Sequence, residues 1–117
     1  SINGHAEVVK LLLGERVELN AVDKEYRTAL IWASINGHAE VVKLLLGERA
    51  ELDAADKEGC TALIWASFNG HVKVVKQLLD EGADIRAFSD NRQTAFSVAM
   101  VQEHYEIAEL LMSYWEY

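Results

Sequence analysis

Apolar residues recur along the chain in a pattern that predicts short pairs of helices. The pairs Val41–Val42 and Leu45–Leu46 stand at i, i+1, i+4 and i+5, so they share one face of a helix. Before them, the small and apolar segment Ala29–Ser34 follows Thr28, a residue that caps helix N-termini well. Asn36–Gly37 separates the two segments and predicts a turn between two helices.

The same pattern returns after a fixed interval of 33 residues. The segment Ser1–Arg16 recurs without change as Ser34–Arg49, and about two thirds of Asp23–Ala55 recurs in Asp56–Phe88. A more divergent copy begins at Ser89. A period of this size predicts a solenoid, in which each repeat buries its apolar face only against its neighbours. We therefore expect one domain, residues 1–117, made of a partial repeat (1–22), two full repeats (23–55 and 56–88) and a C-terminal repeat (89–117).

One repeat carries the residues that connect the chain to a known family. They fall in the order D-x-x-G-x-T-x-L, then A, G-H, V-V, L-L and G-A-D, and they are Asp56, Gly59, Thr61, Ala62, Leu63, Ala66, Gly70, His71, Val74, Val75, Leu78, Leu79, Gly82, Ala83 and Asp84. This pattern resembles the ankyrin repeat, whose period is the same. The resemblance implies an all-α solenoid of stacked helix-turn-helix units with projecting hairpin-like turns.

The chain departs from the ankyrin pattern at two places in every repeat and at a third in two of them. Alanine replaces the family's proline, and isoleucine or serine replaces the histidine of the first helix, at Ala29, Ala62, Ala95, Ile31, Ile64 and Ser97. The resemblance then implies that the imidazole link usually formed between repeats is missing. Tyr26 and Arg92 stand where the family has a turn glycine. We expect these changes to alter turn and packing chemistry without breaking the fold.

Charge and composition exclude several classes of partner. The formal net charge is −8, which argues against binding a nucleic acid backbone. The apolar runs are far shorter than the ~20 residues that cross a membrane, so no membrane is expected. The chain has one cysteine, Cys60, and no recognisable signal segment. These features favour an intracellular protein, with the cytoplasm as the expected compartment.

The resemblance also implies where a partner would bind. Ankyrin-like proteins bind other proteins through a concave surface made of turn tips and the exposed side of the first helices. Carried over position by position, this predicted binding surface consists of Lys24, Glu25, Arg27, Ile35, Asn36, Lys57, Glu58, Cys60, Phe68, Asn69, Asp90, Asn91, Gln93, Val101 and Gln102. Arg27, Cys60 and Gln93 differ at one equivalent position, as residues at a binding surface would, although any exposed position varies in this way.

No residue pattern points to catalysis, a metal or a cofactor. One histidine opens the second helix of each repeat, at His5, His38, His71 and His104. Equivalent points in neighbouring repeats lie roughly 10 Å apart, too far to share a zinc ion, so we interpret these histidines as structural. Cys60 has no orienting third group beside it, and we interpret it as an unreactive thiol. The chain is therefore not expected to be an enzyme.

Three further residues have competing interpretations. Trp32 and Trp65 are of a type enriched in binding hot spots, yet the equivalent residue in the last repeat is Val98, which favours a buried or half-buried packing role. The segment that ends at Asn20 resembles the asparagine-hydroxylation pattern of ankyrin repeats, but an ordinary turn residue is the favoured interpretation.

The two ends of the chain suggest other functions. The first unit begins at the end of a first helix, which predicts an uncovered apolar face. Four aromatic residues gather near the other end, at Tyr105, Tyr114, Trp115 and Tyr117, and either seal the last groove or form a contact patch. The main hypothesis is a protein-binding module. The alternatives are a self-assembling or engineered scaffold, associating through either end, and the regulatory fragment of a larger enzyme.

Overall fold

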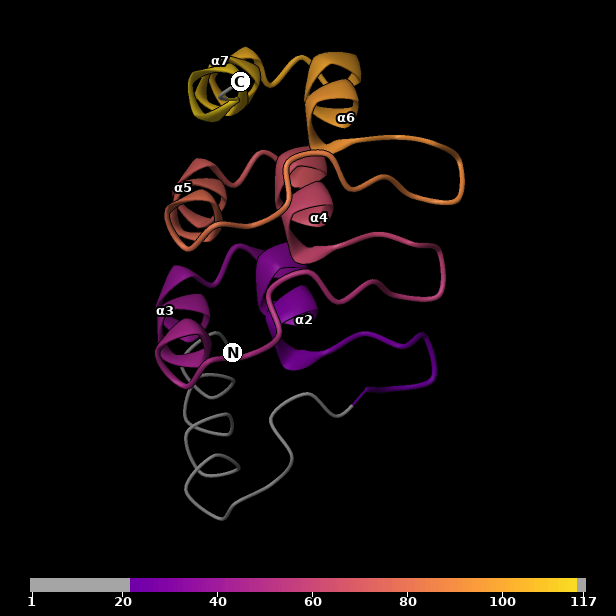
Figure 1. Cartoon of the computed structure of the whole chain (residues 1–117), viewed down its shortest axis with the longest axis vertical. Helices are drawn as coiled ribbons and strands as arrows, with labels where there is room; N and C mark the ends of the chain where they lie inside the picture. Colours follow the sequence, from indigo (N-terminus) through magenta and orange to yellow (C-terminus); the bar gives the residue numbers. More distant parts are fainter. Residues whose placement is uncertain (1–21, 116–117) are drawn as a thin grey trace.

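The computed structural model describes residues 22–115, which form a stack of three helical pairs (Figure 1). The helices are α2 (Ala29–Asn36), α3 (Ala39–Gly47), α4 (Ala62–Asn69), α5 (Val72–Asp80), α6 (Ala95–Val101) and α7 (Tyr105–Tyr114). The first helices α2, α4 and α6 make one layer, and α3, α5 and α7 make the other. The loops between pairs project to one side as hairpins. The all-α solenoid predicted from the sequence is confirmed. The partial first repeat and Asn20 lie outside the described residues.

Threonine starts each first helix, as the sequence pattern predicts. The hydroxyl groups of Thr28, Thr61 and Thr94 accept hydrogen bonds from the backbone N–H three residues later, at 3.2, 3.3 and 3.1 Å. These bonds satisfy N–H groups that have no partner inside the helix. Gly37 and Gly70 end α2 and α4 in the left-handed conformation, which glycine adopts without strain. Cap and stop signals therefore set the length of the first helices.

The core runs without interruption from one repeat to the next. Alanine occupies the same position in each first helix, at Ala33, Ala66 and Ala99, and each is fully buried. This small side chain lets α2, α4 and α6 pack directly against one another. The second helices add buried valine and leucine pairs, such as Val74–Val75 and Leu78–Leu79. Because each repeat buries its helices against its neighbours, the repeats are placed at a regular spacing.

Imidazole groups also join the repeats, although not from the position where the family has its histidine. Nε2 of His71 lies 2.9 Å from the carbonyl oxygen of Ile35, and Nε2 of His104 lies 3.1 Å from that of Phe68. Each bond connects the start of a second helix to the end of the preceding repeat's first helix. The link expected to be missing is the one from the first helix, where Ile31, Ile64 and Ser97 carry no imidazole, and histidines of the second helices join the repeats instead. The prediction of a structural role for these histidines is confirmed for this pair.

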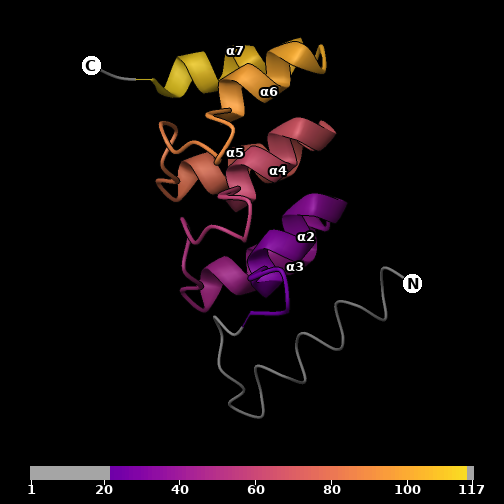
Figure 2. The same ribbon diagram turned by 90° about the vertical axis from the view of Figure 1, so that its right-hand side faces the viewer.

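Hydrogen bonds between backbone groups also join the hairpins. The N–H of Lys57 donates to the carbonyl of Glu25 at 2.7 Å, and that of Asp90 donates to Glu58 at 2.9 Å. Successive tips therefore lie side by side along one edge of the stack, which faces the viewer in Figure 2. No helix within residues 22–115 is long and apolar enough to cross a membrane.

The left-handed glycines provide a matched pair for testing the histidine link. At Gly37, an added Cβ would lie 2.5 Å from Nδ1 of His71, whereas at Gly82 it would meet nothing within 4 Å. Both residues have positive φ, so both alanine variants carry the same backbone strain of about 1–2 kcal/mol. We expect Gly37→Ala to lower the free energy of unfolding by at least about 1 kcal/mol more than Gly82→Ala, because His71 must move. Urea denaturation measures both, and equal losses would contradict tight packing at Gly37.

Candidate protein-binding surface

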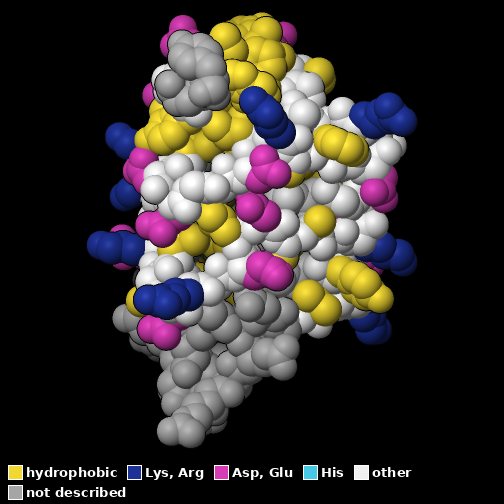
Figure 3. Space-filling view, viewed as in Figure 1, with side chains coloured by type: hydrophobic (Ala, Val, Ile, Leu, Met, Phe, Trp, Pro, Cys, Tyr) yellow, Lys and Arg dark blue, Asp and Glu magenta, His cyan; other side chains and the backbone are white. Residues whose placement is uncertain are grey.

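The structure describes every residue of the predicted binding surface, in two exposed groups and three partly exposed residues. The hairpin residues Lys24, Glu25, Lys57, Glu58, Asp90, Asn91 and Gln93 are exposed at or beside the tips. The other exposed residues stand at the C-terminal ends of the first helices, at Asn36, Phe68, Asn69, Val101 and Gln102. Arg27, Ile35 and Cys60 are only partly exposed. Basic side chains follow the row of tips along the right-hand edge in Figure 3.

Some of these residues hold the fold together. The side-chain amide of Asn69 donates to the carbonyl of Ile35 in the preceding repeat at 2.9 Å. The amide of Asn36 donates to the carbonyl of Trp32 within its own helix at 3.0 Å. A partner that bound these amides would compete with bonds already made, so the tips are the freer part of the surface.

An aspartate carboxylate organises each of the first two described hairpins. Oδ1 of Asp56 accepts the backbone N–H groups of Glu58 and Cys60, both at 3.0 Å, and Oδ2 accepts the indole N–H of Trp65 at 2.8 Å. Asp23 makes the equivalent bonds, including one at 2.7 Å from the indole of Trp32. The bond from the backbone of Arg27 is the largest of the effects that lower the pKa of Asp23. Each hairpin is thus fastened to the first helix that follows it.

Arg27 fills the space between two tryptophans of neighbouring repeats. Its guanidinium carbon lies 5.1 Å from the ring centre of Trp32 and 5.2 Å from that of Trp65. Its Nε also lies 3.4 Å from Oδ2 of the buried Asp56. Cations are attracted to aromatic faces at this range. Both tryptophans therefore have the packing role that the sequence predicts. Trp65 is half-buried as expected, whereas Trp32 is 37% exposed and lies at the surface.

One repeat further along the chain, a pocket of about 380 Å³ lies at the position that corresponds to Arg27 and its two tryptophans. We call it the tip pocket. It is lined by Glu58, Cys60, Ile64, Trp65, Phe68, Ser89, Asp90, Asn91, Gln93 and Val98. Six of these residues were predicted from the sequence as binding residues. Trp65, Ile64, Ser89 and Val98 were not, because their side chains reach the pocket only through the way the repeats stack. The volume is in the range of sites that hold a ligand or a partner's side chain.

Cys60 lies inside the tip pocket as an unreactive thiol. Burial is the main cause that raises its pKa to about 11, and the carboxylates of Asp56, Glu58 and Asp90 add to the effect. The thiolate is the nucleophile in cysteine chemistry. At neutral pH the thiol therefore stays protonated, which agrees with its interpretation from the sequence.

Ligand atoms of Asp56, Glu58 and Cys60 lie within 4.8 Å of one another, close enough to suggest a metal site. The carboxylate of Asp56, however, is already engaged by two backbone N–H groups, the Trp65 indole and Arg27. The thiol would also have to lose its proton, against its raised pKa. The arrangement builds the hairpin and is poorly suited to hold a metal ion.

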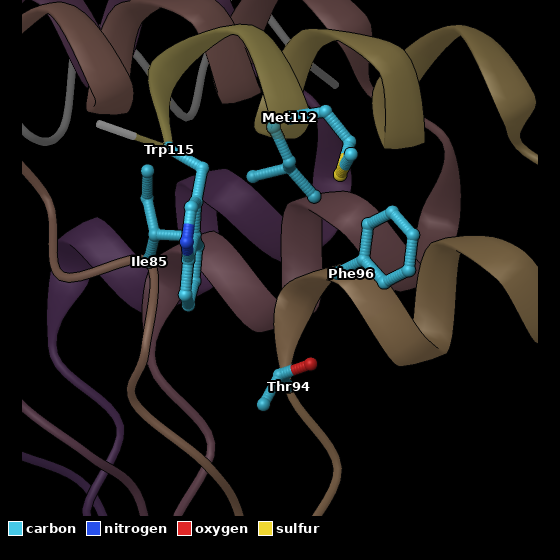
Figure 4. A pocket seen from close by; sticks show the side chains of 6 residues that line it. Ile85, Thr94, Phe96, Met112 and Trp115 are labelled. Carbon is cyan, nitrogen blue, oxygen red and sulfur yellow. The ribbon is translucent and has the colours of Figure 1, made fainter. Parts of the chain in front are cut away.

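A second pocket, of about 330 Å³, lies at the end of the stack and is mostly apolar. In Figure 4, Trp115 lies beside Ile85, and Met112 points from α7 toward Phe96 on α6. The guanidinium of Arg86 stands 4.7 Å from the Trp115 ring centre, and the hydroxyl of Tyr114 donates to Asp80. Tyr114 therefore helps to seal the last groove. Tyr117 lies outside the described residues.

Apolar side chains remain exposed at the end of the stack. Exposed apolar residues gather over the outer face of the last helical pair (Figure 3), at Met100, Val101, Tyr105, Met112 and Trp115. Both interpretations of the aromatic end thus find support, since Tyr114 seals a groove while Tyr105 stays 55% exposed.

The stack around Arg27 predicts that lysine cannot replace arginine there. Lysine keeps the charge but loses the planar group that packs between the two rings. We expect Arg27→Lys to lower the free energy of unfolding by about 1 kcal/mol. Arg92→Lys, the same change at an exposed hairpin tip, should alter it by less than about 0.5 kcal/mol. Urea denaturation measures the stability of both variants. If Arg27→Lys leaves the free energy of unfolding unchanged, the stack contributes nothing to stability.

The raised pKa of Cys60 predicts slow alkylation. The shift from 9.0 to about 11 lowers the thiolate fraction near pH 8 by about a hundredfold. A more basic thiolate is also a better nucleophile, which offsets about tenfold of this loss. We therefore expect iodoacetamide to react about tenfold more slowly with the folded chain than with the urea-unfolded chain, as followed by mass spectrometry. Equal rates would mean that the pKa is not raised.

Comparison with known proteins agrees with this architecture. A family model described as ankyrin repeats, in three copies, matches residues 1–89. The matched segment covers more than half of the chain, and α6 and α7 continue the same stack after it. No curated protein matches the chain. The chain belongs to the ankyrin repeat family.

Proposed function

We propose that this chain binds another protein through the tips of its hairpins and the adjoining sides of its first helices. Ankyrin repeats are generally protein–protein interaction modules. The observation that supports this face in particular is the tip pocket, which lies open among the exposed residues Glu58, Phe68 and Asp90. Its volume suits a side chain, and its aromatic wall offers the contact that dominates many interfaces.

Charge supports a neutral or basic partner protein. The net charge of −8 repels nucleic acid backbones and acidic protein surfaces. Within the tip pocket, the charged lining residues are the acids Glu58 and Asp90. A basic segment of a partner would therefore approach with favourable electrostatics.

An intracellular location, with the cytoplasm as the expected compartment, is part of the same proposal. Cys60 is a free thiol and lies half-buried within the hairpin network. A free thiol is kept reduced in the cytosol, so such a location suits this residue. Detection of the chain in fractionated cells tests this part separately.

The ankyrin repeat family is generally non-enzymatic. A regulatory role within a larger enzyme is an alternative that would use the same surface, because a regulatory array also acts by contacting protein. The sequence of the complete gene product distinguishes it from a free-standing binding module.

Self-association is a second candidate function, supported by the exposed apolar side chains at the end of the stack. Met100, Val101, Tyr105 and Met112 stand where a further repeat would pack in a longer solenoid. Uncovered solenoid ends favour association. Sedimentation over a hundredfold range of concentration tests this candidate: larger species at high concentration support it, and a constant monomer mass excludes it.

The binding proposal predicts that three substitutions, two at a hairpin tip and one at the end of α4, weaken capture without unfolding the chain. Peptides would first be selected from a phage-displayed library against the immobilised chain. We expect Lys57→Ala, Glu58→Ala and Phe68→Ala together to weaken the selected peptides at least about tenfold, because central aromatic and charged contacts carry most binding energy. The variant should stay folded, because Lys57 and Glu58 are exposed and Phe68, at 39% exposed, loses mainly its edge contact with Trp65. Only a small fall in the thermal midpoint is therefore expected.

A matched control uses the other helical layer. Lys73→Ala, Glu81→Ala and Tyr105→Ala remove the same kinds of side chain from exposed positions on α5, after it and on α7. Binding of the selected peptides should be preserved. Loss of binding in this control, with binding intact in the tip variant, would assign the interface to the second helices.

A further inference from the structure

The tip pocket lies one repeat after Arg27, at the position where an equivalent arginine would be. Arg27 is held by three neighbours, the rings of Trp32 and Trp65 and the carboxylate of Asp56. One repeat period later, the positions of Arg27, Trp32, Asp56 and Trp65 are taken by Cys60, Trp65, Ser89 and Val98. All four of these later residues line the tip pocket. The cavity therefore occupies the place where a second arginine would stand, and a short thiol leaves it empty.

The walls of the pocket keep features that suit a guanidinium group. Trp65 remains on one side, and Phe68 packs edge-on against it with ring centres 6.1 Å apart. Val98 takes the place of the second tryptophan, and Phe68, in place of the aliphatic Ile35 of the preceding repeat, supplies a second aromatic ring instead. Aromatic faces attract cations, and arginine also stacks on them.

Two carboxylates supply the negative charge at its mouth. Glu58 and Asp90 both line the pocket, and the hydrogen bond from the Asp90 N–H to the Glu58 carbonyl fixes their hairpins side by side. Among residues 22–115, no lysine or arginine lines the pocket. The same carboxylates raise the pKa of Cys60, which shows that a negative potential reaches the base of the pocket. Ser89 stands in place of the buried Asp56, so the intramolecular ion pair of the Arg27 stack has no equivalent here.

We propose that the tip pocket receives an arginine side chain from the partner protein, stacked against Trp65 and neutralised by Glu58 and Asp90. The inference rests on the proposed function and names the side chain that the binding surface recognises. The partner's arginine takes the position that Arg27 takes one repeat earlier, and the thiol of Cys60 forms the floor. An uncharged or acidic segment would leave the two carboxylates without a counter-charge and is disfavoured.

The test uses pentapeptides that differ only at a central residue between glycines, with blocked ends. The central residue is arginine, citrulline, lysine or leucine, and each peptide is titrated into the 15N-labelled chain. We expect millimolar binding of the arginine peptide that shifts the indole N–H of Trp65 and the amides of Cys60 and Gln93. Citrulline has nearly the same shape without charge and should bind about fivefold more weakly or not at all. Added salt should weaken the binding of the arginine peptide.

Two variants locate the effect in the pocket. Cys60→Arg supplies the missing side chain from within the chain, so it should remove the peptide-induced shifts and raise the thermal midpoint, whereas Cys60→Ser should keep the shifts. Should Cys60→Arg fail to fold, Glu58→Gln with Asp90→Asn serves instead and should reduce the shifts at least about fivefold. Its control is Glu40→Gln with Glu81→Gln, which removes the same charge from exposed residues outside the pocket.

The outcomes separate this inference from the proposed function. Equal shifts with arginine, citrulline and leucine would overturn the arginine pocket while leaving a peptide-binding surface at the tips. Equal binding of lysine and arginine would overturn stacking of the guanidinium as the basis of recognition. An absence of shifts with every peptide would overturn the inference as well, whereas the proposed function would still be decided by the capture of selected peptides and its loss in the tip variant.

Discussion

The structure depends on one constraint: each repeat can bury its helices only against the repeats on either side. The alanines at Ala33, Ala66 and Ala99 make this possible, because their small side chains let the first helices pack side by side. Once those helices are in register, the hairpins before them must also lie next to one another, and the bonds from Lys57 and Asp90 join their backbones. The surface that we propose for binding is therefore a consequence of the core.

Near-identical repeats present different surfaces where the copies differ in sequence. The fold tolerates Arg27, Cys60 and Gln93 at one equivalent position because none of them is needed for the helices to stack. The consequences for the surface are nevertheless large. Arginine closes the space between two tryptophans, whereas cysteine leaves a pocket in the next repeat. A few differences between copies, at Cys60, Phe68, Ser89 and Val98, thus change the surface from a filled stack to an open pocket while the scaffold stays the same.

Much of the fold and part of the site could be predicted from the sequence, and the boundary between them has a physical cause. Helix positions follow from local periodicity and from caps such as Thr61, and exposure at the tips follows from hairpin geometry. Contacts between repeats depend on side-chain direction across more than thirty residues. Examples are the bond from His71 to Ile35 and the packing of Arg27 against Trp65. The sequence pattern predicted neither partner, and it placed Arg27 only on the exposed binding surface.

The most direct test of the account is to map where a bound protein segment contacts the chain. A peptide selected against the immobilised chain would be titrated into the 15N-labelled protein, and the shifted backbone amides would be placed on the structure. Binding through the proposed surface predicts that the shifts centre on the hairpin tips and the first helices, around Glu58, Phe68 and Asp90. Shifts confined to α3 and α5, or to the outer face of α6 and α7, would contradict it.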